Sequence, residues 1–176
     1  GIYKEKGSTA ITGGTVNINC TASGIQTLNG AGKTSITGGK VTITDTNETS
    51  TVKGINAGGE MEIGGTAEVT FKNCKYDILS TNSKNKISGG KITLSGATAG
   101  LYVNADFAMT DGEIESNCKA ESLYIAQGTT TLSSGTLKLQ GGISTKTEQN
   151  YPIYVAGSSV LDFAGANVTV DASGYF

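Results

Sequence analysis

The chain has 176 residues and a formal net charge of −2, it contains no histidine, and all 13 of its basic residues are lysines. These features exclude catalysis through histidine. They also argue against a nucleic-acid partner, because phosphate recognition relies on clustered positive charge and on arginine. No apolar stretch approaches the roughly 20 residues that cross a bilayer, so we expect no membrane span in this segment.

Small-residue corners recur along the chain, and a run of alternating apolar and polar residues follows each of them. The corners are Gly13-Gly14, Gly38-Gly39, Gly64-Gly65, Gly89-Gly90, Asp111-Gly112, Ser134-Gly135 and Gly165-Ala166. Their second residues lie 22 to 31 positions apart, a repeat length typical of a solenoid of stacked coils.

Three alternating runs recur in every repeat, and each places its apolar residues on one side of a short strand. The first run, after the corner, contains Val16/Ile18, Val41/Ile43, Ala67/Val69, Ile92/Leu94, Ile114/Ser116, Leu137/Leu139 and Val168/Val170. The second contains Ile25, Ile55, Ile78, Leu101/Val103, Leu123/Ile125 and Ile153/Val155. The third, before the next corner, contains Ile11, Ile36, Met61/Ile63, Ile87, Phe107/Met109, Leu132 and Leu161/Phe163.

This pattern predicts an all-β fold, a right-handed parallel β-helix with three short strands per coil and about seven coils. The handedness follows the general crossover preference of parallel strands. We expect residues 1–176 to form a single β-helix domain with uncapped ends. The absence of a start methionine or signal peptide suggests a fragment excised from a longer surface protein. The longest corner insertion, residues 141–150, is the expected lateral projection.

Three cysteines, Cys20, Cys74 and Cys118, fall on alternate coils. At a strand spacing of roughly 4.8 Å, neighbouring cysteines would be about 10 Å apart, which is beyond the reach of a disulfide. We therefore expect buried free thiols.

Two acidic groups offer oxygen ligands or acid/base chemistry. Glu113 and Glu115 point outward from one strand, and the repeat places Lys91 and Lys138 beside them, so a calcium or acid/base pair competes with a surface ion-pair ladder. A metal-site candidate consists of Asp45, Asn47 and Glu48, three hard ligands in one short corner. Calcium is the cofactor that this corner suggests, and a solvated turn is the alternative interpretation.

The most suggestive pattern is aromatic. The outward residues of the second run in three successive coils are Tyr102, Tyr124 and Tyr154. Stacked coils would align these phenols in one column, which could contact sugar rings while Asn104 and Gln127 hydrogen-bond sugar hydroxyls. These five residues form the predicted ligand-binding site. The alternative is that the tyrosines pair only to stabilise the solenoid.

Threonines are frequent on the outside, which raises the question of an ice-binding surface. The outward column expected after the corners is Asn17, Thr42, Glu68, Thr93, Glu115, Lys138 and Thr169. Because charged residues interrupt this column, it does not match the regular uncharged array that such a surface needs.

Two segments carry a family resemblance: Lys53-Gly54-Ile55-Asn56-Ala57 followed by Glu60-Met61-Glu62-Ile63-Gly64-Gly65, and Thr37-Gly38-Gly39-Lys40-Val41-Thr42-Ile43. They resemble repeats of bacterial cell-surface β-helix proteins, in particular the carbohydrate-binding domain family with a polysaccharide-lyase-like fold. The resemblance implies extracellular placement, binding to polysaccharide, and sometimes calcium. Pectate-lyase relatives imply a catalytic arginine or lysine with clustered aspartates around calcium. This chain has no arginine and no aspartate cluster, so we expect no enzyme activity.

We therefore expect a non-enzymatic carbohydrate-binding or adhesion module, secreted or on the bacterial cell surface, whose partner is a polysaccharide or surface glycan. Two alternatives remain at this stage. One is a calcium-dependent, lyase-like enzyme that works with lysine and carboxylates, and the other is a purely structural stalk.

Overall fold

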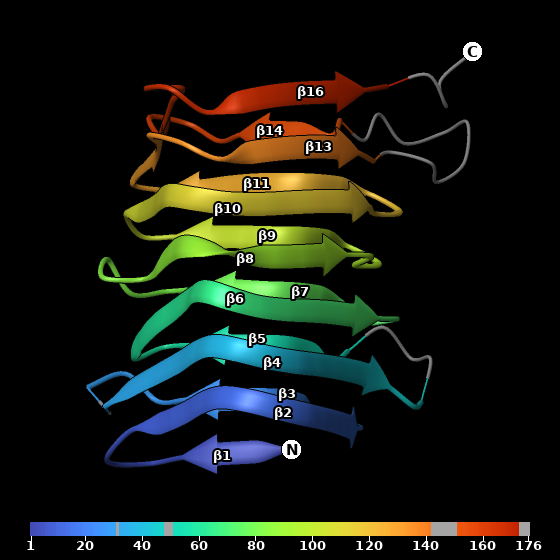
Figure 1. The fold of residues 1–176 in the computed structure, drawn as a ribbon. Helices are drawn as coiled ribbons and strands as arrows, with labels where there is room; N and C mark the ends of the chain where they lie inside the picture. Colours follow the sequence, from blue (N-terminus) through green and yellow to red (C-terminus); the bar gives the residue numbers. More distant parts are fainter. Residues whose placement is uncertain (31, 48–50, 142–150, 173–176) are drawn as a thin grey trace.

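The computed structural model describes residues 1–30, 32–47, 51–141 and 151–172. Its regular structure within these ranges is entirely β, with sixteen strands and no helix. The strands stack in parallel into a β-solenoid of about six turns, which rises from β1 near the N-terminus to β16 near the C-terminus (Figure 1). The expected all-β parallel solenoid is therefore confirmed.

Two sheets run along the solenoid. The seven-stranded sheet contains β1 (Ile2–Lys4), β3 (Ser23–Thr27), β5 (Lys53–Ala57), β7 (Tyr76–Ser80), β9 (Ala99–Asn104), β11 (Glu121–Gln127) and β14 (Ile153–Val155). The nine-stranded sheet contains β2 (Thr9–Cys20), β4 (Lys33–Asp45), β6 (Glu60–Lys72), β8 (Lys86–Leu94), β10 (Phe107–Asn117), β12 (Thr129–Leu132), β13 (Thr136–Gln140), β15 (Val160–Asp162) and β16 (Asn167–Asp171).

The predicted corners lie inside the nine-stranded sheet. In the long strands β2, β4, β6, β8 and β10, the expected third and first runs belong to one strand, and the pairing register shifts where the corner falls. Gly39 has a φ of 78° there, a conformation that costs glycine little and other residues more. The glycine corners therefore bend a continuous strand.

The core is a narrow apolar column between the two sheets. The inward residues predicted in the middle coils are almost fully buried, among them Ile36, Ile55, Ile78 and Met109. The last level differs, because Val155, Phe163 and Val170 are 39%, 52% and 48% exposed. No described strand lies beyond β14, β15 and β16 to cover them.

The predicted register was wrong at one coil. Val41 pairs with Val69, and Ile43 pairs with Phe71, whereas the repeat pattern had aligned them with Ala67 and Val69. Strand β6 contains one more residue than β4 between the aligned isoleucines and the next aligned pair, Lys40 and Glu68. As a result Thr70, and not Glu68, follows Thr42 in the outward column.

Candidate functional site: a tyrosine ladder on the seven-stranded sheet

The tyrosines lie on the outer face of the seven-stranded sheet. Tyr102 of β9 is the register partner of Tyr124 of β11, and Tyr124 is the partner of Tyr154 of β14. Their chain neighbours Leu101, Leu123 and Ile153 point into the core or pack against it, so alternation turns each phenol outward. The predicted alignment of the three phenols in one column is confirmed.

A fourth tyrosine extends this column. The ring centroids of Tyr76 and Tyr102 are 5.0 Å apart, and their planes are inclined by 56°. Register alone did not predict this contact, because Leu79 is the partner of Tyr102, while Tyr76 is aligned with Ala99. The Tyr76 ring therefore meets the Tyr102 ring diagonally, between residues that are not register partners. We call Tyr76, Tyr102, Tyr124 and Tyr154 the tyrosine ladder.

Neighbouring rings among Tyr102, Tyr124 and Tyr154 stack face to face. Tyr102 and Tyr124 lie 4.8 Å apart between centroids at an interplanar angle of 8°, and Tyr124 and Tyr154 lie 4.9 Å apart at 29°. A sugar ring therefore cannot stack on either face of Tyr124. The ladder instead presents ring edges and phenol hydroxyls.

The protonated phenol is the form that this surface favours. Partial burial, followed by the neighbouring phenols Tyr124 and Tyr76, raises the pKa of Tyr102. Partial burial raises the pKa of Tyr124 as well, with Tyr154 as the next cause. Each hydroxyl thus remains both a hydrogen-bond donor and an acceptor over the physiological pH range.

Asn104 and Gln127 lie at the end of the same strands as Tyr102 and Tyr124. They are register partners, both exposed, and a bulge between Ile125 and Gln127 brings them level. The structure thus brings together all five predicted ligand-binding residues. At the other end of the ladder the Lys75 ammonium lies 5.2 Å from the centroid of the Tyr76 ring, a cation–π contact that the sequence did not predict.

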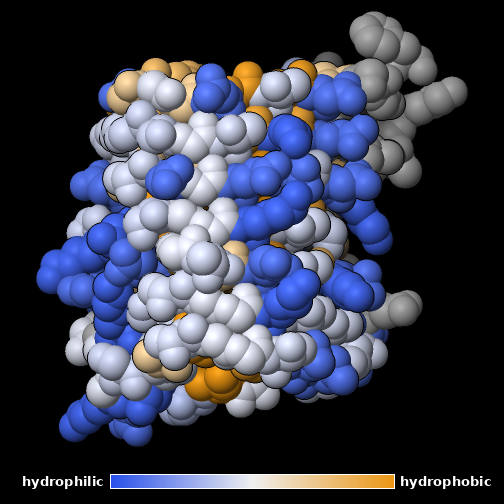
Figure 2. Space-filling view, viewed as in Figure 1, coloured by the Kyte–Doolittle hydropathy of each residue, from blue (hydrophilic) through white to orange (hydrophobic). Residues whose placement is uncertain are grey.

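The charged residues pair with one another on the nine-stranded sheet. Lys91 contacts Glu113 at 3.7 Å and Glu115 at 3.2 Å, and Lys138 contacts the same carboxylates at 3.2 and 3.1 Å. Figure 2 shows the hydrophilic side chains along this face. The lysine hydrogen bonds lower the pKa of Glu115. The ion-pair ladder is therefore formed, and its carboxylates are engaged by lysines.

A second charged cluster surrounds Glu62. Its carboxylate contacts the ammonium groups of Lys33 and of Lys86, the latter at 3.3 Å, and accepts a hydrogen bond of 2.8 Å from Ser88 Oγ. These bonds, with Lys33 first, lower the pKa of Glu62 to about 2. The glutamate is ionised at every pH near neutrality.

The predicted metal corner is only partly described. Asp45 is buried, and its Oδ1 accepts a hydrogen bond of 2.8 Å from the backbone nitrogen of Asn47, whose side chain is exposed. Glu48 lies outside the described residues. Within the described ranges no three histidine, cysteine, aspartate or glutamate side chains gather as metal ligands would. Calcium binding at this corner stays a prediction.

Strand β7 carries a buried carboxyl group at Asp77. Asp77 is fully buried, its Oδ2 accepts a hydrogen bond of 2.5 Å from Ser95 N, and its Oδ1 has no partner among the described residues. Burial raises the pKa of Asp77 well above its ordinary value. Nearby Cys74 and Cys118 are free, as is Cys20, and all three are buried, so the expected free thiols are confirmed. Burial raises the pKa of Cys74 and Cys118 to about 12, which makes them inert.

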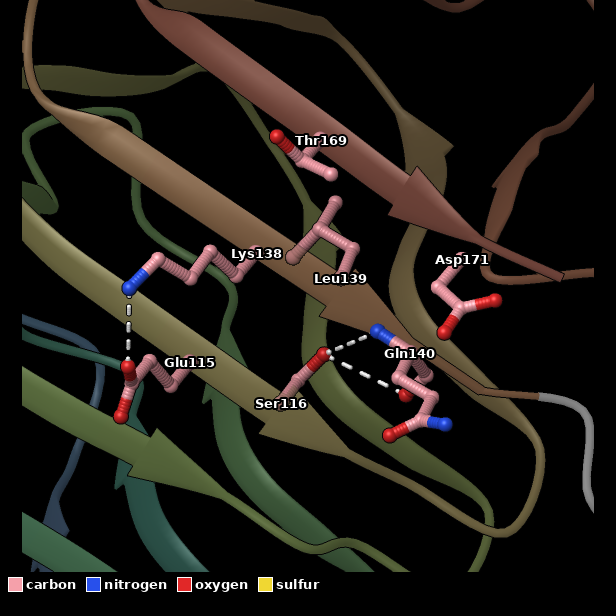
Figure 3. Close-up of a pocket in the computed structure, with 7 residues that line it drawn as sticks. All are labelled: Glu115, Ser116, Lys138, Leu139, Gln140, Thr169 and Asp171. Carbon is pink, nitrogen blue, oxygen red and sulfur yellow. Dashed lines mark hydrogen bonds and ion pairs between the residues drawn. The ribbon is translucent and has the colours of Figure 1, made fainter. Parts of the chain in front are cut away.

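A shallow hollow of about 300 Å³ opens where β10, β13 and β16 end (Figure 3). Ser116 Oγ accepts a hydrogen bond of 3.2 Å from Gln140 N at its base, and Lys138 pairs with Glu115 at its rim. The predicted projection at 141–150 begins beside this hollow, and its residues 142–150 lie outside the described ranges.

Comparisons with known proteins identify no relative. No family model matches the chain, and no curated protein or solved structure matches it either. In the described residues there is no helix long and apolar enough to cross a membrane.

Proposed function

We propose that the chain is a non-enzymatic extracellular module that binds carbohydrate or mediates adhesion through the outer face of the seven-stranded sheet. The observation that carries this proposal is the row of phenol hydroxyls on Tyr102, Tyr124 and Tyr154, set beside the register-paired amides of Asn104 and Gln127. Hydroxyl and amide groups are suited to the hydroxyls of a glycan, which both donate and accept hydrogen bonds.

Ring stacking between neighbours decides how such a ligand is held. The faces of Tyr102 and Tyr124 are in contact with one another, so the ligand meets ring edges and hydroxyl groups. Repeated hydroxyls along the solenoid axis favour an extended polymer over a single sugar, because each unit of a polymer adds contacts and raises avidity.

A hydroxyl deletion tests this proposal more sharply than removal of a whole ring. Tyr124→Phe preserves the stacked ring and removes one hydroxyl, and Asn104→Ala removes one amide. We expect both variants to lose at least tenfold in affinity for a polysaccharide identified on a glycan array, measured by pull-down on the insoluble polymer or by calorimetry.

The matched control is Thr70→Ala on the nine-stranded sheet, which removes a hydroxyl from the opposite face. It should bind as the unmodified protein does. If no glycan binds, or if Tyr124→Phe and Asn104→Ala bind as tightly as Thr70→Ala, the tyrosine ladder has no part in recognition.

A second candidate, a purely structural stalk, is favoured by a specific observation. Each tyrosine ring stacks on a tyrosine of the adjacent coil, and Lys91 and Lys138 pair with Glu115 of the coil between them. Contacts between coils of this kind stiffen a rod without any ligand. The stalk would show no glycan binding and yet lose stability when the ladder is broken.

The same proposal includes the handedness of the solenoid, its number of strands and coils, and the location of the protein. We expect the winding to be right-handed, with three strands per coil and seven coils, and the protein to be secreted or surface-attached in bacteria. The resemblance of the 53–57 and 60–65 segments to bacterial surface β-helix repeats with a polysaccharide-lyase-like fold supports this assignment. A lyase-like activity with calcium is tested by the absorbance of unsaturated sugar products on acidic polymers.

A further inference from the structure

Tyrosine is the readily oxidised side chain that this molecule leaves open to solvent. The sequence has no tryptophan and no histidine. Both methionines, Met61 and Met109, are fully buried, and the thiols of Cys20, Cys74 and Cys118 are buried as well. Burial protects thioethers and thiols, since their oxidation follows exposure and thiolate character. Among the described residues, an oxidant in solution therefore meets tyrosine rings first.

The tyrosine ladder holds two of these rings in a nearly parallel stack. The ring centroids of Tyr102 and Tyr124 lie 4.8 Å apart at an interplanar angle of 8°, and both side chains are half-buried. The strands that carry them, β9 and β11, lie on successive levels of the solenoid and pair in register at these residues (Figure 1). Two groups held in this way react at an effective concentration far above that of the protein in solution.

A parallel stack is the approach by which two phenoxyl radicals join. In such a radical the unpaired electron occupies orbitals perpendicular to the ring, with much of its density on the Cε carbons beside the oxygen. The new bond therefore forms along the normal of the rings, face to face. Tyr76 is inclined by 56° to Tyr102, and Tyr154 by 29° to Tyr124, so these two pairs align the orbitals less well. Tyr102 and Tyr124 are the pair best placed to couple.

We propose that Tyr102 and Tyr124 form a site of oxidative cross-linking, at which a haem peroxidase with hydrogen peroxide joins the two rings into dityrosine within one molecule. The bond connects a Cε carbon of Tyr102 with a Cε carbon of Tyr124. It ties β9 to β11 and restrains the unfolded chain, as a disulfide does. The cross-link needs no carbohydrate ligand, so it stands apart from the proposed binding function.

The reaction removes two hydrogen atoms from the protein. Each ring first gives one electron to the peroxidase and its hydroxyl proton to water. The two radicals then share their unpaired electrons in one carbon–carbon bond. Each joined carbon loses its hydrogen as a proton, and each oxygen regains a proton, so both hydroxyls are restored. In sum, two C–H bonds break and one C–C bond forms, while two electrons and two protons convert hydrogen peroxide into two water molecules.

Treatment of the 176-residue protein with a peroxidase and hydrogen peroxide tests this assignment. Denaturing gel electrophoresis isolates single chains after the reaction. Mass spectrometry of their proteolytic fragments then locates the cross-link, as a pair of joined peptides that lacks two hydrogen atoms, and dityrosine fluorescence follows the yield.

Three variants identify the rings that couple. Tyr124→Phe and Tyr102→Phe each keep the stacked ring and remove one hydroxyl, and with it one phenoxyl radical. Tyr76→Phe makes the same change within the ladder but outside the parallel pair, so it is the matched control.

In the unmodified protein and in Tyr76→Phe, we expect the main cross-link of single chains to join the peptide of Tyr102 to that of Tyr124. Its yield in Tyr124→Phe and in Tyr102→Phe should fall by about tenfold or more, because the remaining phenol has lost the partner held at a high effective concentration. Dilution of the protein should suppress cross-links between chains and leave this yield unchanged, since the reaction within one molecule does not depend on concentration.

Three results would overturn the proposal. They are the absence of dityrosine from single chains, a main cross-link that joins another pair of tyrosines, and a yield in Tyr124→Phe equal to that of the unmodified protein. Circular dichroism checks that the variants fold. If Tyr124→Phe does not, Tyr102→Phe provides the same test from the other ring of the pair.

Discussion

The rings of Tyr102 and Tyr124 face each other on adjacent strands, with centroids 4.8 Å apart and planes 8° from parallel. This separation equals the usual distance of roughly 4.8 Å between paired strands, so the rings stack without bending the backbone. The same side chains that form the candidate binding surface therefore also stabilise the sheet, and experiments must separate the two effects.

Removing the central ring should destabilise the solenoid. Tyr124→Ala loses contacts with Tyr102 and Tyr154, and we expect the free energy of unfolding to fall by about 2 to 4 kcal/mol. Tyr124→Phe retains both stacked contacts and should change it by less than about 1 kcal/mol. Urea unfolding followed by circular dichroism measures the difference.

A double-mutant cycle isolates the ring contact itself. Tyr102→Ala and Tyr124→Ala should be coupled by about 0.5 to 1.5 kcal/mol, while Tyr3→Ala and Tyr124→Ala should be additive because those rings are several strands apart. Additive effects for Tyr102 and Tyr124 would mean that the stacked geometry contributes no energy of its own.

Alternation and repeat length were sufficient to predict the solenoid and much of its surface. A strand turns successive side chains to opposite faces, and parallel in-register pairing carries that assignment from coil to coil. The columns of Tyr102, Tyr124 and Tyr154, and the contacts of Lys91 with Glu113 and of Lys138 with Glu115, follow from these two facts alone.

What the sequence did not reveal depends on local departures from the repeat. One extra residue in β6 moves Thr70 into the outward column in place of Glu68, so Asn17, Thr42, Thr70 and Thr93 form an uncharged run that the even spacing concealed. Tyr76 contacts Tyr102 although the two residues are not register partners, so alternation and register could not predict this contact.

The glycine at the bend of β4 should be required for two separate reasons. Gly39 has a positive φ of 78°, and an added Cβ would lie 2.5 Å from the carbonyl oxygen of Gly14. We expect Gly39→Ala to lower the free energy of unfolding by about 2 to 4 kcal/mol, since strain and a backbone clash add. Thermal and urea unfolding would measure this loss.

Gly14 provides a matched control for the clash. It has nearly the same φ, 77°, yet a Cβ there would meet nothing within 4 Å. Gly14→Ala should therefore cost only the backbone strain, about 1 kcal/mol. Equal losses for Gly14→Ala and Gly39→Ala would show that the approach of neighbouring coils at Gly39 relaxes freely.

Glu62 should stabilise the fold in a pH-dependent way. Its pKa is lowered from 4.5 to about 2 by Lys33, Ser88 and Lys86, so the ionised form is favoured in the folded state. That contribution is present above pH 4.5 and is lost as the pH falls through about 2. We expect Glu62→Gln to cost about 1 to 2 kcal/mol at pH 7, with a deficit that shrinks between pH 4.5 and 2 in urea unfolding.

Glu68 is the comparison residue for this effect. Its side chain is 54% exposed, and among the described residues it forms an ion pair with Lys40 alone, at 3.0 Å. Glu68→Gln should therefore change the stability by less than about 0.5 kcal/mol at pH 7. A deficit for Glu62→Gln that stays constant from pH 7 to pH 2 would assign its effect to packing instead of charge.

The contribution of Asp77 to stability should change with pH in the opposite direction to that of Glu62. Burial raises its pKa in the folded state, so the folded protein retains a proton that the unfolded chain releases above about pH 4. Stability is then highest below that pH and falls by up to about 1.4 kcal/mol per pH unit as the pH rises toward the folded pKa. Asp77→Asn abolishes this loss, and its advantage over the unmodified protein should increase from pH 4 to pH 8 in urea unfolding.

The amide can replace the acid because the hydrogen bond from Ser95 N needs only a carbonyl oxygen at the position of Asp77 Oδ2. At pH 4 the two proteins should be similar in stability, within about 1 kcal/mol, since both side chains are neutral. If Asp77→Asn gains nothing between pH 4 and pH 8, the carboxyl ionises in the fold as it does in water, and its burial carries no electrostatic cost.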